Sequence, residues 1–264
     1  MNSGADVTHN LGVAGQLLVD AAAAGAKLAV LPENFALMGA KEADRLAVAE
    51  AVGAGPIQDA IAAIAQRLSL WIVAGTVPLR GSTPQRVAPA SLVFDANGRQ
   101  VVRYDKIHLF DVDIPGRKAE SYRESATFEP GKEPIVVDTP AGRLGLSVCY
   151  DLRFPELYRV LSARGAQLLA VPAAFTVPTG QAHWEVLLRA RAVENLCYVL
   201  AAAQCGQHAN GRETYGDAMI VDYWGRVLAR RACGEGAGVV VAEVDTAAQA
   251  GVRAGFPALS HRVL

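Results

Sequence analysis

Hydrophobic and polar positions follow two different periods along this chain, and the two periods alternate. Continuous apolar runs of strand length predict buried strands at residues 26–31, 70–77, 143–148, 166–171 and 197–204. Helical spacing of apolar positions predicts amphipathic helices at residues 11–24, 57–68, 155–164 and 184–195. Strands that alternate with helices indicate an α/β architecture.

Two turn signals predict hairpins that complete this pattern. Asn97-Gly98 lies between two β-rich runs and predicts a hairpin over residues 91–103. Trp224-Gly225 predicts the corresponding hairpin over residues 218–229.

The two halves of the chain resemble each other in sequence as well as in element order. Residues 23–35 (AAGAKLAVLPENF) align with residues 163–175 (ARGAQLLAVPAAF), and FDANGR at 94–99 aligns with VDYWGR at 221–226. Chance similarity of short apolar segments is the alternative, but the shared order of elements argues against it. We therefore predict one domain over residues 1–264, built from two similar α/β halves whose sheets pack face to face in a four-layer α-β-β-α sandwich.

The repeat also predicts two differences between the halves. A strand precedes the first helix of the second half, whereas residues 1–10 are polar and turn-like. We expect the first strand to be absent and a strand position to be open beside residues 26–31. The counterpart of Glu33 is Ala173, so the scaffold itself does not require a carboxylate there.

Composition excludes several classes of partner. Hydrophobic residues make up 52% of the chain, which excludes a disordered protein. The 25 basic residues are balanced by 26 acidic ones, so the chain has no excess of positive charge to bind the phosphate backbone of a nucleic acid. The longest apolar stretch, residues 196–203, has 8 residues and is too short to span a membrane. The first ten residues lack the features of a secretory signal, so we expect a cytoplasmic protein without nucleic-acid or membrane partners.

Four cysteines are present, and we expect all four thiols to be free in a reducing cytoplasm. The chain has no Cys-x-x-Cys pair, so the cysteines do not indicate a zinc site. Cys149 follows the apolar run LGLSV and precedes a helix that starts near Pro155, where the helix dipole favours a thiolate nucleophile. A buried structural cysteine is the alternative, which we accept for Cys197, Cys205 and Cys233.

A cysteine nucleophile needs a base, and none of the five histidines has a signature that assigns it to Cys149. Glu33 lies just past a strand, where burial beside a thiol would raise its pKa into a useful range; a solvated loop glutamate is the alternative. Lys106, in the segment RYDKIHLFDVDIP, can hold an oxyanion if it is buried, although most lysines lie on the surface.

Three segments that contain these residues resemble the signatures of the nitrilase superfamily, the carbon–nitrogen hydrolases. They are LPENF (31–35), KIHLFD (106–111) and CYDLRFPEL (149–157), in the Glu, Lys, Cys order of that family. GQAHWEVLLRARAVEN (180–195) and AAAQCG (201–206) resemble the Nit branch, which holds deaminated glutathione amidases and ω-amidases.

The resemblance implies the α-β-β-α sandwich and a set of catalytic roles. Glu33 is the general base, Lys106 and the N–H of Tyr150 stabilise the oxyanion, and Cys149 is the nucleophile. Glu124 is the second glutamate that orients the lysine and the substrate amide, unless it is a surface loop residue. No metal or organic cofactor is implied.

The implied activity is hydrolysis of a small linear ω-amide of the deaminated glutathione type through a cysteine thioester, with release of the amine or ammonia. An ω-amidase of short keto-acid amides and a catalytically idle scaffold of the same fold are the alternatives. Distal substrate carboxylates require donors, for which Arg153, Thr179 and His183 are candidates, the last two in a loop at residues 176–183. The alternative for Arg153 is an ion pair with Glu156 or Asp151.

The family commonly forms homodimers through the helix that follows the nucleophile. Here that helix carries Phe154, Leu157 and Tyr158 close to its start, and we expect a homodimer through this region.

Overall fold

The computed structural model describes residues 1–41, 43–114 and 120–263. The first half contains α1 (Val7–Ala23), β1 (Leu28–Val30), α2 (Asp44–Ala47), α3 (Pro56–Leu68), β2 (Trp71–Arg80), β3 (Val87–Phe94), β4 (Gln100–Asp105), β5 (Asp111–Ile114), β6 (Glu120–Arg123) and the 3-10 helix η1 (Glu124–Ala126). The second half contains β7 (Val136–Thr139), β8 (Gly142–Leu146), the 3-10 helix η2 (Cys149–Arg153), α4 (Pro155–Ala163), β9 (Leu168–Ala170), α5 (Val177–Asn195), β10 (Tyr198–Ala201), β11 (Cys205–Gln207), β12 (Glu213–Tyr215), β13 (Ala218–Val221), β14 (Val227–Arg231) and α6 (Thr246–Gly255).

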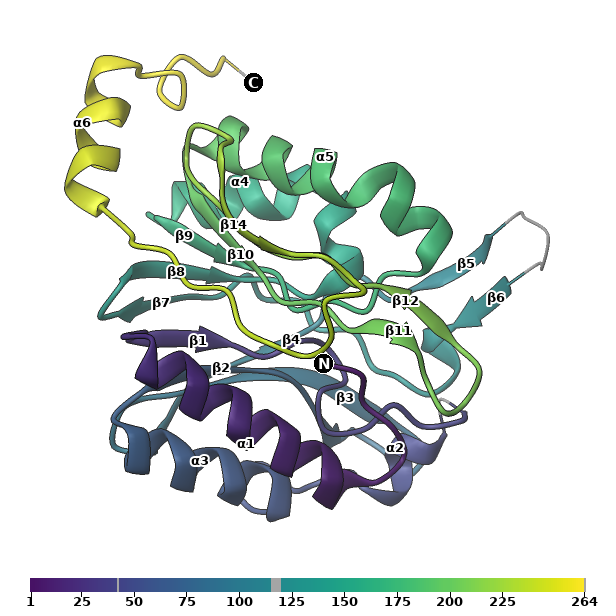
Figure 1. Ribbon diagram of the computed structural model, residues 1–264. Helices are drawn as coiled ribbons and strands as arrows, with labels where there is room; N and C mark the ends of the chain where they lie inside the picture. Colours follow the sequence, from purple (N-terminus) through teal and green to yellow (C-terminus); the bar gives the residue numbers. More distant parts are fainter. Residues whose placement is uncertain (42, 115–119, 264) are drawn as a thin grey trace.

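Two sheets form the middle layers of the molecule (Figure 1). The first has the strand order β1-β2-β3-β4 and the second has the order β14-β13-β10-β9-β8-β7. Helices α1 and α3 cover the outer face of the first sheet, and α4 and α5 cover the outer face of the second. The predicted four-layer α-β-β-α sandwich is therefore confirmed.

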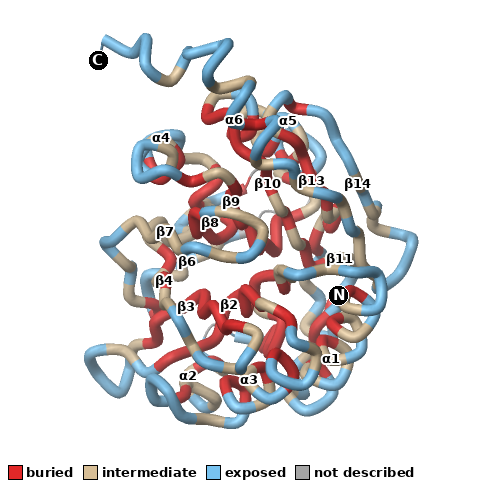
Figure 2. Tube along the Cα trace, turned by 90° about the vertical axis from the view of Figure 1, so that its left-hand side faces the viewer, coloured by how far each residue is buried: buried red, intermediate tan, exposed pale blue. Residues whose placement is uncertain are grey.

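Side chains alternate between the two faces of the first sheet, as the pleat requires. Val73 and Val93 are fully buried in the cluster that joins the two sheets, whereas Ile72 and Leu92 pack in a second cluster with residues of α1 and α3. Figure 2 shows that the buried residues concentrate along the strands and on the helix faces that cover them. No helix in the described part of the chain is long and apolar enough to cross a bilayer.

The internal repeat is visible in the topology and in the hairpin turns. The β1–β2 pair and the β9–β10 pair are both parallel, and each is followed by antiparallel strands. Asp95 accepts hydrogen bonds from the N–H groups of Asn97 and Arg99. Asp222 accepts the equivalent bonds from the N–H groups of Trp224 and Arg226. The same turn chemistry therefore closes both hairpins.

The repeat breaks beside β1. In the second half β8 pairs in parallel with β9, but among the described residues no strand occupies the equivalent position along β1, which forms a sheet edge. A cavity of about 380 Å³ lies there, where the sequence predicts an open strand position. Its apolar lining comes from α1, β1, β10, β13 and the extended segment 239–244, and includes Leu18, Leu28, Val30, Leu200, Met219 and Val241.

Two helices begin earlier than the sequence pattern predicts. Helix α1 starts at Val7 because the Asp6 side chain caps it by accepting a hydrogen bond from the N–H of His9. Helix α5 starts at Val177 and has a proline in its first turn. A proline is tolerated there because the first N–H groups of a helix have no acceptor within the helix. The prediction of a loop at residues 176–183 is therefore wrong, because these residues form the N-cap and first turns of α5.

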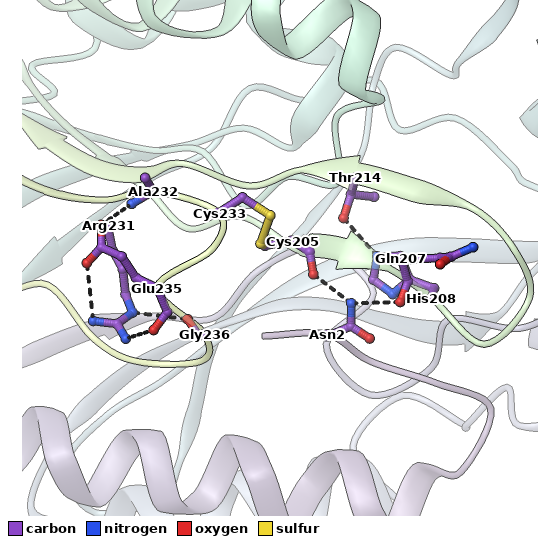
Figure 3. The surroundings of a disulfide bond; sticks show 10 residues. All are labelled: Asn2, Cys205, Gln207, His208, Thr214, Arg231, Ala232, Cys233, Glu235 and Gly236. Atoms are coloured by element: carbon purple, nitrogen blue, oxygen red, sulfur yellow. Dashed lines mark hydrogen bonds and ion pairs between the residues drawn. A yellow bond between two sulfur atoms is a disulfide. The ribbon is translucent and has the colours of Figure 1, made fainter.

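The expectation of four free thiols is also wrong. Cys205 and Cys233 form a disulfide with a Cα–Cα distance of 5.5 Å, while Cys149 and Cys197 are free. The bond joins β11 to the segment after β14, two parts of the chain whose proximity the spacing of the cysteines does not reveal (Figure 3). Asn2 lies beside it and donates hydrogen bonds to the carbonyls of Cys205 and Gln207.

Candidate active site

Glu33 lies in the turn that follows β1, and its side chain is buried beside Lys106 and Cys149. The next residue, Asn34, has a φ of 58°, and its N–H donates to the hydroxyl of Thr76. Gln204 fixes the same turn from the second half by donating to the carbonyl of Glu33 at 3.2 Å. Side chains from both halves of the molecule therefore fix the backbone of the turn that carries the Glu33 carboxylate.

Lys106 follows β4 and is completely buried. Its Nζ lies 2.9 Å from Oε1 of Glu33, and 2.8 and 3.1 Å from the two carboxylate oxygens of Glu124. Glu124 begins η1 and also accepts a hydrogen bond from the N–H of Phe110 at 2.8 Å. A buried ammonium thus lies between two carboxylates.

Cys149 begins η2 in a strained conformation, with a φ of 50°. Its N–H donates to the carbonyl of Pro172 at 2.8 Å, and its side chain is hydrogen-bonded to Glu33 and to the backbone of Ala174. A non-glycine residue at positive φ persists only where its surroundings determine it, and such residues cluster at functional sites.

The charges of this cluster are set mainly by burial and by Lys106. Burial alone would raise the pKa of Glu33, but the charge of Lys106 and hydrogen bonds from Cys149 and Lys106 outweigh it and lower this pKa. Burial opposes the charge on Lys106 as well, yet Glu124 and Glu33 raise its pKa well above the ordinary value. Burial and the neighbouring Glu33 raise the pKa of Glu124 despite its contact with Lys106.

These directions correct two predictions. Glu33 was expected to have a raised pKa from burial, but the adjacent ammonium reverses the effect. Cys149 was expected to favour the thiolate, but burial and the charge of Glu33 raise its pKa well above the ordinary value. The resting pair is therefore a neutral thiol hydrogen-bonded to an ionised carboxylate.

A small pocket opens beside the thiol. Of the predicted substrate-binding residues, Tyr150, Arg153 and Thr179 line it, whereas His183 does not. His183 lies behind Arg153, with its Nδ1 at 3.2 Å from Nη1 of the arginine. The lining consists of Glu33, Phe110, Glu124, Cys149, Tyr150, Arg153, Ala174, Phe175, Thr179 and Arg212.

Arg153 forms no ion pair with Glu156 or Asp151, the two partners considered from the sequence. Its guanidinium carbon lies 5.8 Å from the ring centre of Tyr150 and 5.4 Å from that of Phe175. Aromatic faces thus hold this cation at the pocket wall.

Arg212 is a pocket residue that the sequence analysis missed. It lies in the turn between β11 and β12, donates to the carbonyl of Ala174 at 2.8 Å, and lies over the ring of Tyr122. The segment around it carries no signal in a single sequence, because only the fold brings this hairpin to Cys149. Within the described residues, no group of three or more His, Cys, Asp or Glu side chains is arranged to hold a metal ion.

Comparison with known proteins shows the family of this chain. The carbon–nitrogen hydrolase family model matches residues 1–254. A deaminated glutathione amidase of Synechocystis is 45% identical over 267 residues, covering 100% of this chain and 96% of the relative. The human deaminated glutathione amidase is 41% identical over 260 residues, covering 97% of this chain and 78% of the relative.

Two solved structures share the whole fold. The Caenorhabditis elegans NitFhit protein superimposes with a TM-score of 0.89 at 40% identity, and this chain covers 63% of its length. Nit3 of Saccharomyces cerevisiae, described as a member of branch 10 of the nitrilase superfamily, has a TM-score of 0.87 at 28% identity, with 93% of its chain covered. The chain therefore belongs to the carbon–nitrogen hydrolase family of the nitrilase superfamily.

Proposed function

We propose that this amidase hydrolyses a linear amide that carries carboxylates away from the scissile bond, of the type of deaminated glutathione. The observation that carries this proposal is the guanidinium of Arg153 at the wall of the pocket that contains Cys149. No described carboxylate forms an ion pair with it, so it is available to a substrate carboxylate. Relatives at 41% and 45% identity named deaminated glutathione amidase support the same substrate class.

The reaction proceeds through a thioester on Cys149. Glu33 accepts the thiol proton while the sulfur attacks the amide carbon, and the developing oxyanion is held by Lys106 and the N–H of Tyr150. Glu33 then gives the proton to the departing amine. Water attacks the thioester with Glu33 again as base, which releases the acid and restores the thiol.

The geometry suits these roles. The thiol is neutral at rest, so a base in hydrogen-bond contact is required, and Glu33 is ionised beside it. Two carboxylates fix the ammonium of Lys106 before the substrate binds, so little reorganisation accompanies oxyanion formation. The N–H of Tyr150 has no backbone acceptor within the part of the chain that the structure describes.

We assign substrate binding to Arg153 and Thr179 at the pocket wall, and a supporting role to His183, which contacts Arg153. The test is steady-state kinetics of wild type and Arg153→Gln on deaminated glutathione, on a short keto-acid ω-amide and on an amide without carboxylates. Amine and ammonia are both measured. Arg189→Gln, on the outer part of α5, is the matched control.

The proposal predicts that Arg153→Gln raises KM at least tenfold for deaminated glutathione and leaves the carboxylate-free amide within about twofold, since a charge-assisted hydrogen bond contributes about 1.5–3 kcal/mol. Equal losses on both substrates would assign Arg153 to catalysis or folding. Higher efficiency of the wild type on the short ω-amide would move the substrate to the ω-amidase class.

We further propose a homodimer, although Leu157 and Tyr158, two of the residues predicted to form its interface, pack inside the core of the chain. Val160 on α4, with Val186 and Val193 on α5, is exposed and supports a two-fold contact through these helices. Sedimentation of the wild type and of Val186→Glu tests the proposal; a monomeric wild type at micromolar concentration would refute it.

A further inference from the structure

The carboxylate of Asp151 is completely buried and accepts four hydrogen bonds. One oxygen accepts from the hydroxyl of Tyr104 at 2.7 Å and from the N–H of Val148 at 2.8 Å. The other accepts from the N–H and the Nδ1 of His108 at 3.0 and 2.7 Å. No lysine or arginine among the described residues pairs with it, so it relies on these donors.

The donors come from the two segments that carry the reacting groups. Tyr104 and His108 lie two residues before and two residues after Lys106, while Val148 immediately precedes Cys149. Asp151 is thus the point at which the segment of the ammonium and the turn of the thiol are joined. It does not line the pocket, and both of its carboxylate oxygens already accept hydrogen bonds from protein donors.

The turn that Asp151 closes is the strained one. Cys149 has a φ of 50°, and the N–H of Asp151 donates to the carbonyl of Val148 at 3.0 Å across that residue. The Val148 N–H in turn donates to the Asp151 carboxylate. Two hydrogen bonds between Val148 and Asp151 therefore close the turn that contains Cys149. A strained residue requires such surroundings to keep its conformation.

We propose that Asp151 is a positioning residue that sets the distance between Cys149 and the Glu33–Lys106 pair. The inference rests on the roles proposed above for those three residues. Loss of one carboxylate oxygen leaves two donors without an acceptor and releases one of the two segments. The thiol and the ammonium then lose their mutual geometry, whereas Arg153 at the pocket wall is also held from outside this turn by His183 and by the ring of Phe175. The main effect therefore falls on kcat rather than on KM.

The test compares Asp151→Asn with Asp217→Asn. Asp217 is also buried and paired, with Arg230, but lies outside the pocket lining. Both variants are expected to unfold at lower denaturant. Asp151→Asn is expected to lose at least tenfold in kcat per folded molecule with KM within about twofold, whereas Asp217→Asn keeps both constants.

Tyr104→Phe keeps the test decisive if Asp151→Asn does not fold, because it removes one hydrogen bond and little volume. It is expected to lower kcat with KM unchanged. Wild-type kcat in folded Asp151→Asn, or in Tyr104→Phe where Asp151→Asn does not fold, would overturn the positioning role. Activity in Cys149→Ala would instead show that the proposed reaction is wrong, which separates the two failures.

Discussion

The Nζ of Lys106 lies 2.9 Å from Oε1 of Glu33, and their side chains are 1% and 5% exposed. A buried ion pair recovers its desolvation cost only with good geometry and further hydrogen bonds, so it is weak support for stability by itself. Here Glu124 supplies the further bonds, and the same contacts keep the lysine charged and the base ionised. The arrangement is therefore better explained by chemistry than by stability.

Glu33→Gln removes the base and retains its shape. We expect kcat to fall by about 10²–10⁴, the usual contribution of a general base. The rate of Cys149 alkylation by iodoacetamide should fall as well, because the buried thiol then has no proton acceptor. Glu156→Gln, an exposed glutamate at the start of α4, should leave both rates unchanged. Equal alkylation rates in wild type and Glu33→Gln would show that another group activates the thiol.

Lys106→Met should change the pH dependence of stability. The raised pKa of Lys106 contributes stability below its ordinary value of 10.5 that is lost as pH rises through the folded value. The lowered pKa of Glu33 contributes stability above its ordinary value of 4.5 that is lost as pH falls through the folded value. The raised pKa of Glu124 acts in the opposite direction to Glu33.

Without the ammonium, Glu33 and Glu124 repel each other and both pKa values rise, so ionisation opposes folding. We expect Lys106→Met to be destabilised by about 3–5 kcal/mol at neutral pH and by less near pH 4. Urea unfolding at several pH values measures this, with the exposed Lys132→Met as control. A penalty independent of pH would contradict the proposed charge states.

The Cys205–Cys233 bond predicts a specific thiol count. Unfolded protein without reductant should react at two thiols, Cys149 and Cys197, and at four after reduction. The cysteines are 28 residues apart, so reduction should lower the free energy of unfolding by roughly 3–4 kcal/mol if chain entropy dominates. Four reactive thiols before reduction would contradict the bond.

The cavity beside β1 predicts a gain from an added strand. Placing about six apolar residues before Met1, which lines the cavity, should raise Tm by at least about 3 °C, because apolar burial and pairing with β1 add about 1 kcal/mol or more. Six Gly and Ser residues at the same place are the control. Identical Tm values for both extensions would mean that the first sheet is complete without a further strand.

Much of the fold was predictable because the pattern of each element is local. The strands β1, β2, β9 and β10 coincide with continuous apolar runs of strand length. Each of the two hairpin turns contains one Asp and one Gly, which the local sequence reveals. Helix starts were less predictable, because a capping side chain such as Asp6 extends a helix into residues whose own pattern is polar.

The order of Glu33, Lys106 and Cys149 could be predicted from motifs, but their ionisation could not. The pKa of Glu33 depends on a lysine 73 positions away, and only the fold sets that distance. Arg212 and the disulfide escaped the sequence analysis for the same reason, since both belong to or adjoin the β11–β12 hairpin, whose location beside the site is a tertiary feature.

The most direct test of the central claim is intact and peptide mass spectrometry of enzyme quenched in acid during turnover of deaminated glutathione. We predict a covalent acyl adduct on the peptide that contains Cys149, with Cys197 unmodified, and no adduct or turnover in Cys149→Ala. Steady turnover by Cys149→Ala, or an adduct only on another residue, would contradict a thioester mechanism at Cys149.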